Sequence, residues 1–195
     1  MKAVFLDIET TGLDATQHCP LELAFCIYDL MAKQKRVICS EVIALSKADW
    51  DKSDQESLKV NGFTWEKVLK GKPLGEVKKQ VVQFFQQEDI QRGKAFFICQ
   101  NPSFDRAFFH HILPVYEQEA MQLPYHWLDL ASMYYATRLN EGGAFPLSLS
   151  KDSIAAHYGL PAEERPHSAL NGVMHLIDCY LKVIKSLPPE RGGSS

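Results

Sequence analysis

The chain has 195 residues, of which 46% are hydrophobic and 23% charged, and its net charge is −3 at pH 7. This composition is typical of a globular domain with a sizeable core, and it excludes a broadly basic protein that coats nucleic acid. No apolar run reaches the roughly 18 residues that a membrane span needs, and the first residues lack a signal-peptide pattern, so we expect no membrane association.

The five cysteines are scattered along the chain and contain no CxxC pair. That pattern is typical of free thiols in a reducing compartment, so we expect a cytoplasmic protein. No linker or internal repeat divides the sequence, which predicts a single domain over residues 1–187. Residues 188–195 are rich in proline, glycine and serine, and we expect them to form a disordered tail.

The first part of the chain predicts three antiparallel strands and a loop. Apolar or alternating residues with short connections predict a meander over residues 2–9, 21–30 and 35–45. Residues 46–63 are polar and interrupted, which predicts a loop with a short helical piece. Pro73 can then open a helix whose apolar face contains valines and phenylalanines.

The rest of the chain alternates short apolar strands with helices. The apolar run 95–99 predicts a buried strand, because turn residues follow it directly. Further expected elements are a helix at 102–113, a strand at 127–130, and helices at about 130–140, 148–158 and 166–185. This order predicts an α/β fold with a mixed five-stranded sheet, in which a three-strand antiparallel meander joins parallel strands and helices flank the sheet.

Two acids interrupt the first predicted strand. Asp7 and Glu9 lie two residues apart, so they share one face of the strand. Like charges are rarely buried side by side without compensation. Thr10 and Gly12 follow, so the strand ends at the acids, and strand ends are where open α/β sheets bind ligands. Hard oxygen ligands of this kind favour Mg²⁺ or Mn²⁺.

A third acid, Asp105, lies in the first turn of the helix expected at 102–113, among aromatic and apolar side chains. The N-terminus of a helix carries partial positive charge, which favours a carboxylate. Two interpretations of Asp105 therefore stay open, a helix-dipole acid or a further ligand of the site.

Several motifs resemble those of the DEDDh family of 3′–5′ exonucleases, which have a ribonuclease H-like fold and include the polymerase III epsilon subunit and RNase T. DIETTG (7–12) is similar to the first motif, and NPSFDRAFF (101–109) resembles the second, with Asp105 at the place of its acid. NGFTWEKVL (61–69) resembles the segment that follows the third strand. HSALNG (167–172) resembles the third motif, which begins with the catalytic histidine.

The resemblance implies a divalent-metal-dependent 3′–5′ exonuclease that removes nucleotides from single-stranded DNA or RNA. Two Mg²⁺ or Mn²⁺ ions would clamp the scissile phosphate. Asp7, Glu9 and Asp105 would hold the ions, and His167 would be the general base.

The resemblance also implies substrate contacts. Thr10 would offer its backbone N–H or hydroxyl near the terminal nucleotide, while Leu13 and Phe109 would wedge or stack against bases. For Phe109, core packing is the slightly stronger interpretation. The implied partner is a single-stranded 3′ end, with a DNA polymerase or a second copy of the chain as further candidates.

Gly172 departs from the resemblance, because the third motif has its fourth metal-binding acid at that position. Asn171 is neutral and lies about 100° away around a helix. Asp178 lies more than a turn and a half further along. Glu163 and Glu164 precede the helix and could swing in, although nothing in the sequence requires it.

Two functions therefore stay open. The retained Asp7, Glu9, Asp105 and His167 favour a working exonuclease with reduced activity, since a pure binding module does not need all four of these residues. Gly172 favours a catalytically impaired relative that binds nucleic-acid ends or a polymerase.

Overall fold

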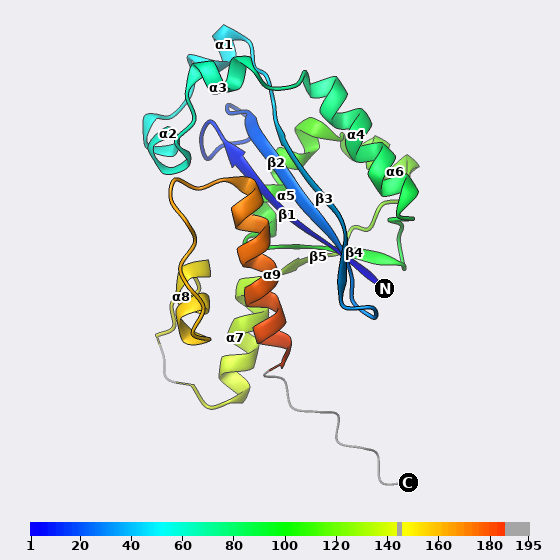
Figure 1. Cartoon of the computed structure of the whole chain (residues 1–195), viewed down its shortest axis with the longest axis vertical. Helices are drawn as coiled ribbons and strands as arrows, with labels where there is room; N and C mark the ends of the chain where they lie inside the picture. Colours follow the sequence, from blue (N-terminus) through cyan, green and yellow to red (C-terminus); the bar gives the residue numbers. More distant parts are fainter. Residues whose placement is uncertain (144–145, 186–195) are drawn as a thin grey trace.

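A mixed five-stranded sheet forms the centre of the computed structural model, which describes residues 1–143 and 146–185 (Figure 1). Its strands are β1 (Lys2–Thr10), β2 (Pro20–Asp29), β3 (Gln34–Val42), β4 (Ala95–Cys99) and β5 (Trp127–Asp129), in the order β3-β2-β1-β4-β5. The first three strands pair antiparallel, and β4 and β5 extend the sheet in parallel from β1. The predicted fold class is therefore confirmed, while the tail expected at 188–195 lies outside the described residues.

Strand β1 is buried on both faces because helices cover both sides of the sheet. Its even-numbered apolar residues face one layer of helices, and Ala3 and Phe5 face the other. The pairing of β1 with β2 is regular from Lys2 to Glu9, so Asp7 and Glu9 continue the row of Ala3 and Phe5. The two acids thus share one face of a central strand, as predicted.

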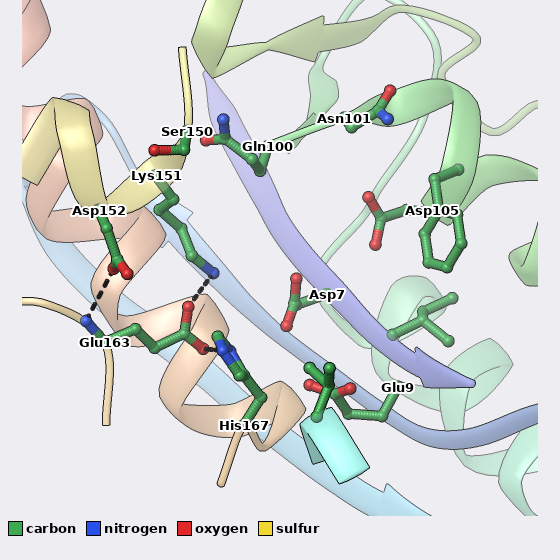
Figure 2. A pocket seen from close by; sticks show the side chains of 13 residues that line it. Asp7, Glu9, Gln100, Asn101, Asp105, Ser150, Lys151, Asp152, Glu163 and His167 are labelled. Atoms are coloured by element: carbon green, nitrogen blue, oxygen red, sulfur yellow. Dashed lines mark hydrogen bonds and ion pairs between the residues drawn. The ribbon is translucent and has the colours of Figure 1, made fainter. Parts of the chain in front are cut away.

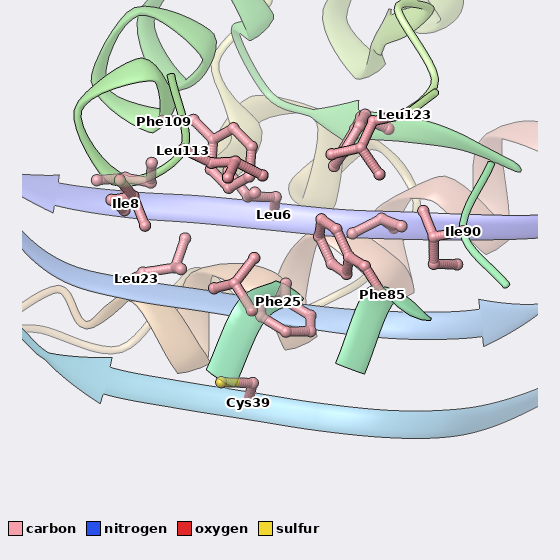
Figure 3. Packing of buried hydrophobic residues seen from close by; sticks show 14 of the residues in the cluster. Leu6, Ile8, Leu23, Phe25, Cys39, Phe85, Ile90, Phe109, Leu113 and Leu123 are labelled. Carbon is pink, nitrogen blue, oxygen red and sulfur yellow. The ribbon is translucent and has the colours of Figure 1, made fainter. Parts of the chain in front are cut away.

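One face of the sheet is covered by α4 (Leu74–Gln87) and α5 (Pro102–Ile112), and Figure 3 shows part of the core between these helices and the strands. Phe109 of α5 is fully buried there, with ring centroids 5.9 Å from Phe97 and 5.7 Å from Trp127. The base-stacking role expected for Phe109 is therefore wrong, because a side chain without exposed surface offers no platform to a base. Phe109 is a core residue.

The opposite face is covered by α7 (Leu130–Asn140), α8 (Lys151–His157) and α9 (Ala169–Lys185). Helix α9 begins at Ala169, later than the expected start at 166, and Glu22 on β2 caps it by accepting the Ala169 backbone N–H at 3.1 Å. His167 therefore precedes the helix. None of the helices in the described ranges is long and apolar enough to cross a membrane.

Short helices complete the described structure: α1 (Lys47–Trp50), α2 (Gln55–Asn61), α3 (Trp65–Leu69) and α6 (Val115–Ala120). The segment 46–63, predicted as a loop with a short helical piece, contains two helices because Ser46 and Asp54 provide side-chain N-caps. The sequence pattern does not indicate α6, which has only six residues. Asn61 at the end of α2 donates from Nδ2 to the carbonyl oxygen of Thr10 at 3.0 Å, which ties α2 to the end of β1.

Candidate active site

A pocket of about 360 Å³ lies where β1 and β4 end (Figure 2). These strands are parallel, so their carboxyl ends meet at one edge of the sheet. The four residues predicted to be catalytic, Asp7, Glu9, Asp105 and His167, all line this pocket. The other lining residues are Ile8, Val60, Gln100, Asn101, Phe104, Ser150, Lys151, Asp152 and Glu163.

Burial determines the charge of the acids in the pocket. Loss of hydration raises the pKa of Asp7 to about 6, although Lys151 opposes the rise. It also raises the pKa of Glu9 to about 8, with the neighbouring Asp7 carboxylate as the second cause. Asp105 is buried as well, and burial together with Asp7 raises its pKa well above the ordinary value. Without a bound cation, the strand tolerates its two acids partly because Glu9 is mostly protonated near neutral pH.

Lys151 is a pocket residue that the sequence analysis missed. It lies in the first turn of α8, and its Nζ is 2.7 Å from Glu163 Oε2 (Figure 2). Burial lowers the pKa of the Lys151 ammonium, but the nearby carboxylates, Asp7 foremost, outweigh burial and raise it, so the ammonium is charged. A lysine in the first turn opposes the helix dipole, which makes the position unusual in the sequence but does not place the residue in the pocket.

Glu163 reaches the pocket from the segment before α9. Its side chain is 3% exposed, and its backbone N–H donates to Asp152 Oδ1 at 3.0 Å. Nδ1 of His167 lies 3.2 Å from Glu163 Oε1, within ion-pair distance but outside hydrogen-bond geometry, so Oε1 has no hydrogen-bond partner. The backbone N–H of His167 donates to the carbonyl oxygen of Val60 at 3.2 Å, which holds the histidine at the mouth of the pocket.

The other acids near the third motif stay outside the pocket. Glu164 accepts a hydrogen bond from Asn171 Nδ2 at 3.3 Å on the exterior, and Asp178 is exposed further along α9. Of the acids considered as substitutes for an acid at position 172, only Glu163 lines the pocket.

Gly172 lies on the first turns of α9 and faces the carboxylate of Asp7. A Cβ added at Gly172 would lie 2.0 Å from Asp7 Oδ2, 2.7 Å from Asp7 Cγ and 3.3 Å from Glu163 Oε1. No side chain fits at position 172 unless Asp7 moves, because real Cβ contacts are longer than 3.0 Å. The position faces the acids of β1, where the resemblance puts an acidic residue.

The residues expected to contact substrate lie in different environments. Thr10 is 5% exposed, and its hydroxyl donates to the carbonyl oxygen of Gly12 at 2.7 Å, so the hydroxyl is already engaged. Leu13 follows in the loop after β1 and is 77% exposed, so its side chain is accessible to a nucleotide.

The donors in the pocket do not fit a centre with two divalent ions. Across residues 1–143 and 146–185, no three His, Cys, Asp or Glu side chains are placed to hold a metal ion together. Gly172 offers no ligand, and the Lys151 ammonium lies among the carboxylates. Asp7, Glu9 and Asp105 line the pocket, but they would have to turn toward one another to share a single ion.

Comparisons with known proteins agree with this architecture. The sequence profile described as exonuclease, RNase T, matches residues 4–180. No curated protein sequence matches the chain. Among solved structures, the fold is similar to that of cell-death related nuclease 4 (CRN-4), with a TM-score of 0.74 and 15% identity over 94% of this chain and 64% of that one.

Two further structures share the fold. One is E. coli Exonuclease I in complex with a dA16 oligonucleotide, with a TM-score of 0.73 and 17% identity over 95% of this chain and 41% of that one. The other is the nuclease domain of 3′hExo, a DEDDh family member bound to rAMP, with a TM-score of 0.71 and 12% identity over 94% of this chain and 92% of that one. This chain thus spans less than two thirds of CRN-4 and about two fifths of Exonuclease I. The profile match over most of its length shows that the chain belongs to the RNase T exonuclease family.

Proposed function

We propose that this protein is a slow 3′–5′ exonuclease that acts on single-stranded nucleic acid with a divalent cation, Mg²⁺ or Mn²⁺. The observation that carries the proposal is that Asp7, Glu9, Asp105 and His167 line one pocket at the strand ends of a family fold. The structures of Exonuclease I with oligonucleotides and of 3′hExo with rAMP support a single-stranded 3′ end as the ligand.

Each residue of the pocket would have a distinct role in hydrolysis. The side chains of Asp7, Glu9 and Asp105 would have to turn toward one cation to hold it, and the cation would supply positive charge for the scissile phosphate. His167 would take the proton of the attacking water at Nε2, because its Nδ1 faces Glu163. The water oxygen bonds to phosphorus, the bond from phosphorus to the 3′ oxygen of the shortened strand breaks, and that oxygen takes up a proton. Leu13, exposed after β1, would pack against the terminal base.

A specific observation favours a second function, the binding of 3′ ends without hydrolysis. Gly172 provides no carboxylate, and the Lys151 ammonium provides a permanent positive charge in the pocket. Such a charge can attract a phosphate without any metal ion. Association with a polymerase or with a second copy of the chain stays a prediction.

The test uses DNA and RNA oligonucleotides that carry a 5′ label and a free 3′ hydroxyl. Stepwise loss of 3′ nucleotides in excess Mn²⁺ or Mg²⁺, abolished by a chelator, supports the exonuclease. Binding of a free 3′ end without shortening supports the second function. Shortening that continues undiminished in excess chelator contradicts the metal-dependent proposal, and neither binding nor shortening contradicts both functions.

A further inference from the structure

The Lys151 ammonium is held in the pocket by two acceptors. Its side chain is 13% exposed, and Nζ lies 2.7 Å from Glu163 Oε2. Nζ also donates to the carbonyl oxygen of Gly172 at 3.4 Å. The ammonium therefore bridges the segment that carries Glu163 and the turn of α9 that faces Asp7 (Figure 2).

The same ammonium acts on the acids of three different elements. It lowers the pKa of Asp7 and Glu9 on β1 and of Asp105 on α5, against the effect of their burial. In return, Asp7, Glu163 and Asp105 raise the pKa of Lys151. One positive charge thus partly compensates the whole acidic cluster, which is the electrostatic part of what a cation bound among these carboxylates would do.

Gly172 provides no carboxylate at the position of α9 that faces Asp7. A side chain there would collide with Asp7 Oδ2 at 2.0 Å and approach Glu163 Oε1 at 3.3 Å. The pocket therefore lacks the acid of the third motif at position 172 and contains the ion pair of Lys151 and Glu163 beside that position. The missing acid reduces the negative charge that is available to attract free cations, and the ion pair adds none.

We propose that the Lys151 ammonium, paired with Glu163, takes the place of a second divalent cation, so that the pocket binds no more than one divalent ion. The inference rests on the proposed function, because it assumes that the pocket acids bind a divalent ion at all. Lys151 is then a positioning residue, because its ammonium sets the net charge of the pocket and the number of divalent ions that the pocket binds.

The experiment counts Mn²⁺ ions on the full chain without nucleic acid, by titration followed by electron paramagnetic resonance of free Mn²⁺. We expect no more than one ion on the wild-type chain. Lys151→Met removes the charge, and we expect Mn²⁺ to bind at least about tenfold more tightly, since a cation beside a divalent ion repels it. Combining Lys151→Met with Gly172→Asp, in which Asp7 must move to make room for the new side chain, should admit a second ion.

The control is Lys94→Met. Lys94 also pairs with a carboxylate, Asp89, at 2.6 Å, but it is exposed and lies before β4, at the opposite end of that strand from the pocket. Lys94→Met should leave the Mn²⁺ count and affinity unchanged.

Two ions on the wild-type chain would overturn the proposal, and so would a folded Lys151→Met variant with wild-type affinity. If that variant does not fold, the wild-type count and Lys151→Arg decide, because the arginine keeps the charge and should keep the count. Failure of the proposed function is a separate result. If the wild-type chain hydrolyses 3′ ends and binds two ions, only the role proposed for Lys151 is overturned. If Lys151→Met binds Mn²⁺ more tightly but the wild-type chain cleaves no substrate, only the exonuclease function is overturned.

Discussion

The contact between Gly172 and Asp7 leads to a prediction on stability. In a helix, replacing Gly by Ala is favourable by up to about 1 kcal/mol, because glycine loses more conformational freedom on folding. Gly75 in the first turn of α4 provides the matched control, since nothing lies within 4 Å of an added Cβ there. Gly75→Ala should therefore raise the free energy of unfolding.

Gly172→Ala should behave differently because its Cβ would lie 2.0 Å from Asp7 Oδ2 and 2.7 Å from Asp7 Cγ. The Asp7 side chain or the strand must shift, and overpacking of this kind costs about 1–3 kcal/mol. Both variants gain helix propensity, so most of the difference between them comes from the overpacking at Gly172. Gly172→Ala should be less stable than Gly75→Ala by about 1–3 kcal/mol. Each kcal/mol should lower the melting temperature by about 2–4 °C in a chain of this length.

The assay is urea denaturation of both variants in chelator, so that bound metal does not mask the contact. Circular dichroism follows the loss of helix, and equal slopes against urea verify that the comparison is valid. If Gly172→Ala is stabilised as much as Gly75→Ala, then Gly172 does not face Asp7. The assignment of residues 167–172 to the third motif would then be in the wrong register.

Three further predictions follow from the pocket and the core. Folding raises the pKa of Glu9 from 4.5 to about 8, so the metal-free protein should lose stability as the pH increases from 4.5 to 8. Thermal melts over this pH range should show a smaller loss of stability for Glu9→Gln than for the wild-type chain. Phe109→Ala should lower the free energy of unfolding by about 3–5 kcal/mol, because the ring is fully buried, and a small change would contradict its place in the core. Leu13→Ala should leave stability unchanged but weaken binding of a single-stranded oligonucleotide, whereas equal binding would exclude Leu13 as a contact.

The acidic residues of this pocket can be predicted from the sequence, whereas its positively charged residue, Lys151, cannot. The spacing of Asp7 and Glu9 determines that they share a strand face, and the motifs correctly place Asp105 and His167 in the same pocket. Lys151 could not be placed in the same way, because its approach depends on how α8 packs beside α9, and no local pattern encodes that packing.

Phe109 and the short helices show two other limits. Helix α5 contains two consecutive phenylalanines, Phe108 and Phe109, so helical periodicity alone does not determine which ring lies in the core. Helices α1 and α2 depend on side-chain caps rather than on an apolar stripe, and such short elements leave little periodic signal.

The most direct test of the account is the shortening of a 5′-labelled single strand by the wild-type chain and by Asp105→Asn in excess Mn²⁺. We expect the wild-type chain to remove nucleotides one at a time from the 3′ end. Asp105→Asn keeps the size of the buried side chain but cannot ionise beside a cation, and it should slow the reaction by at least about tenfold, the lower end of the effect of damaging a metal site. An intact substrate with the wild-type chain, or equal rates for the two proteins, would contradict the assignment of this pocket as the active site.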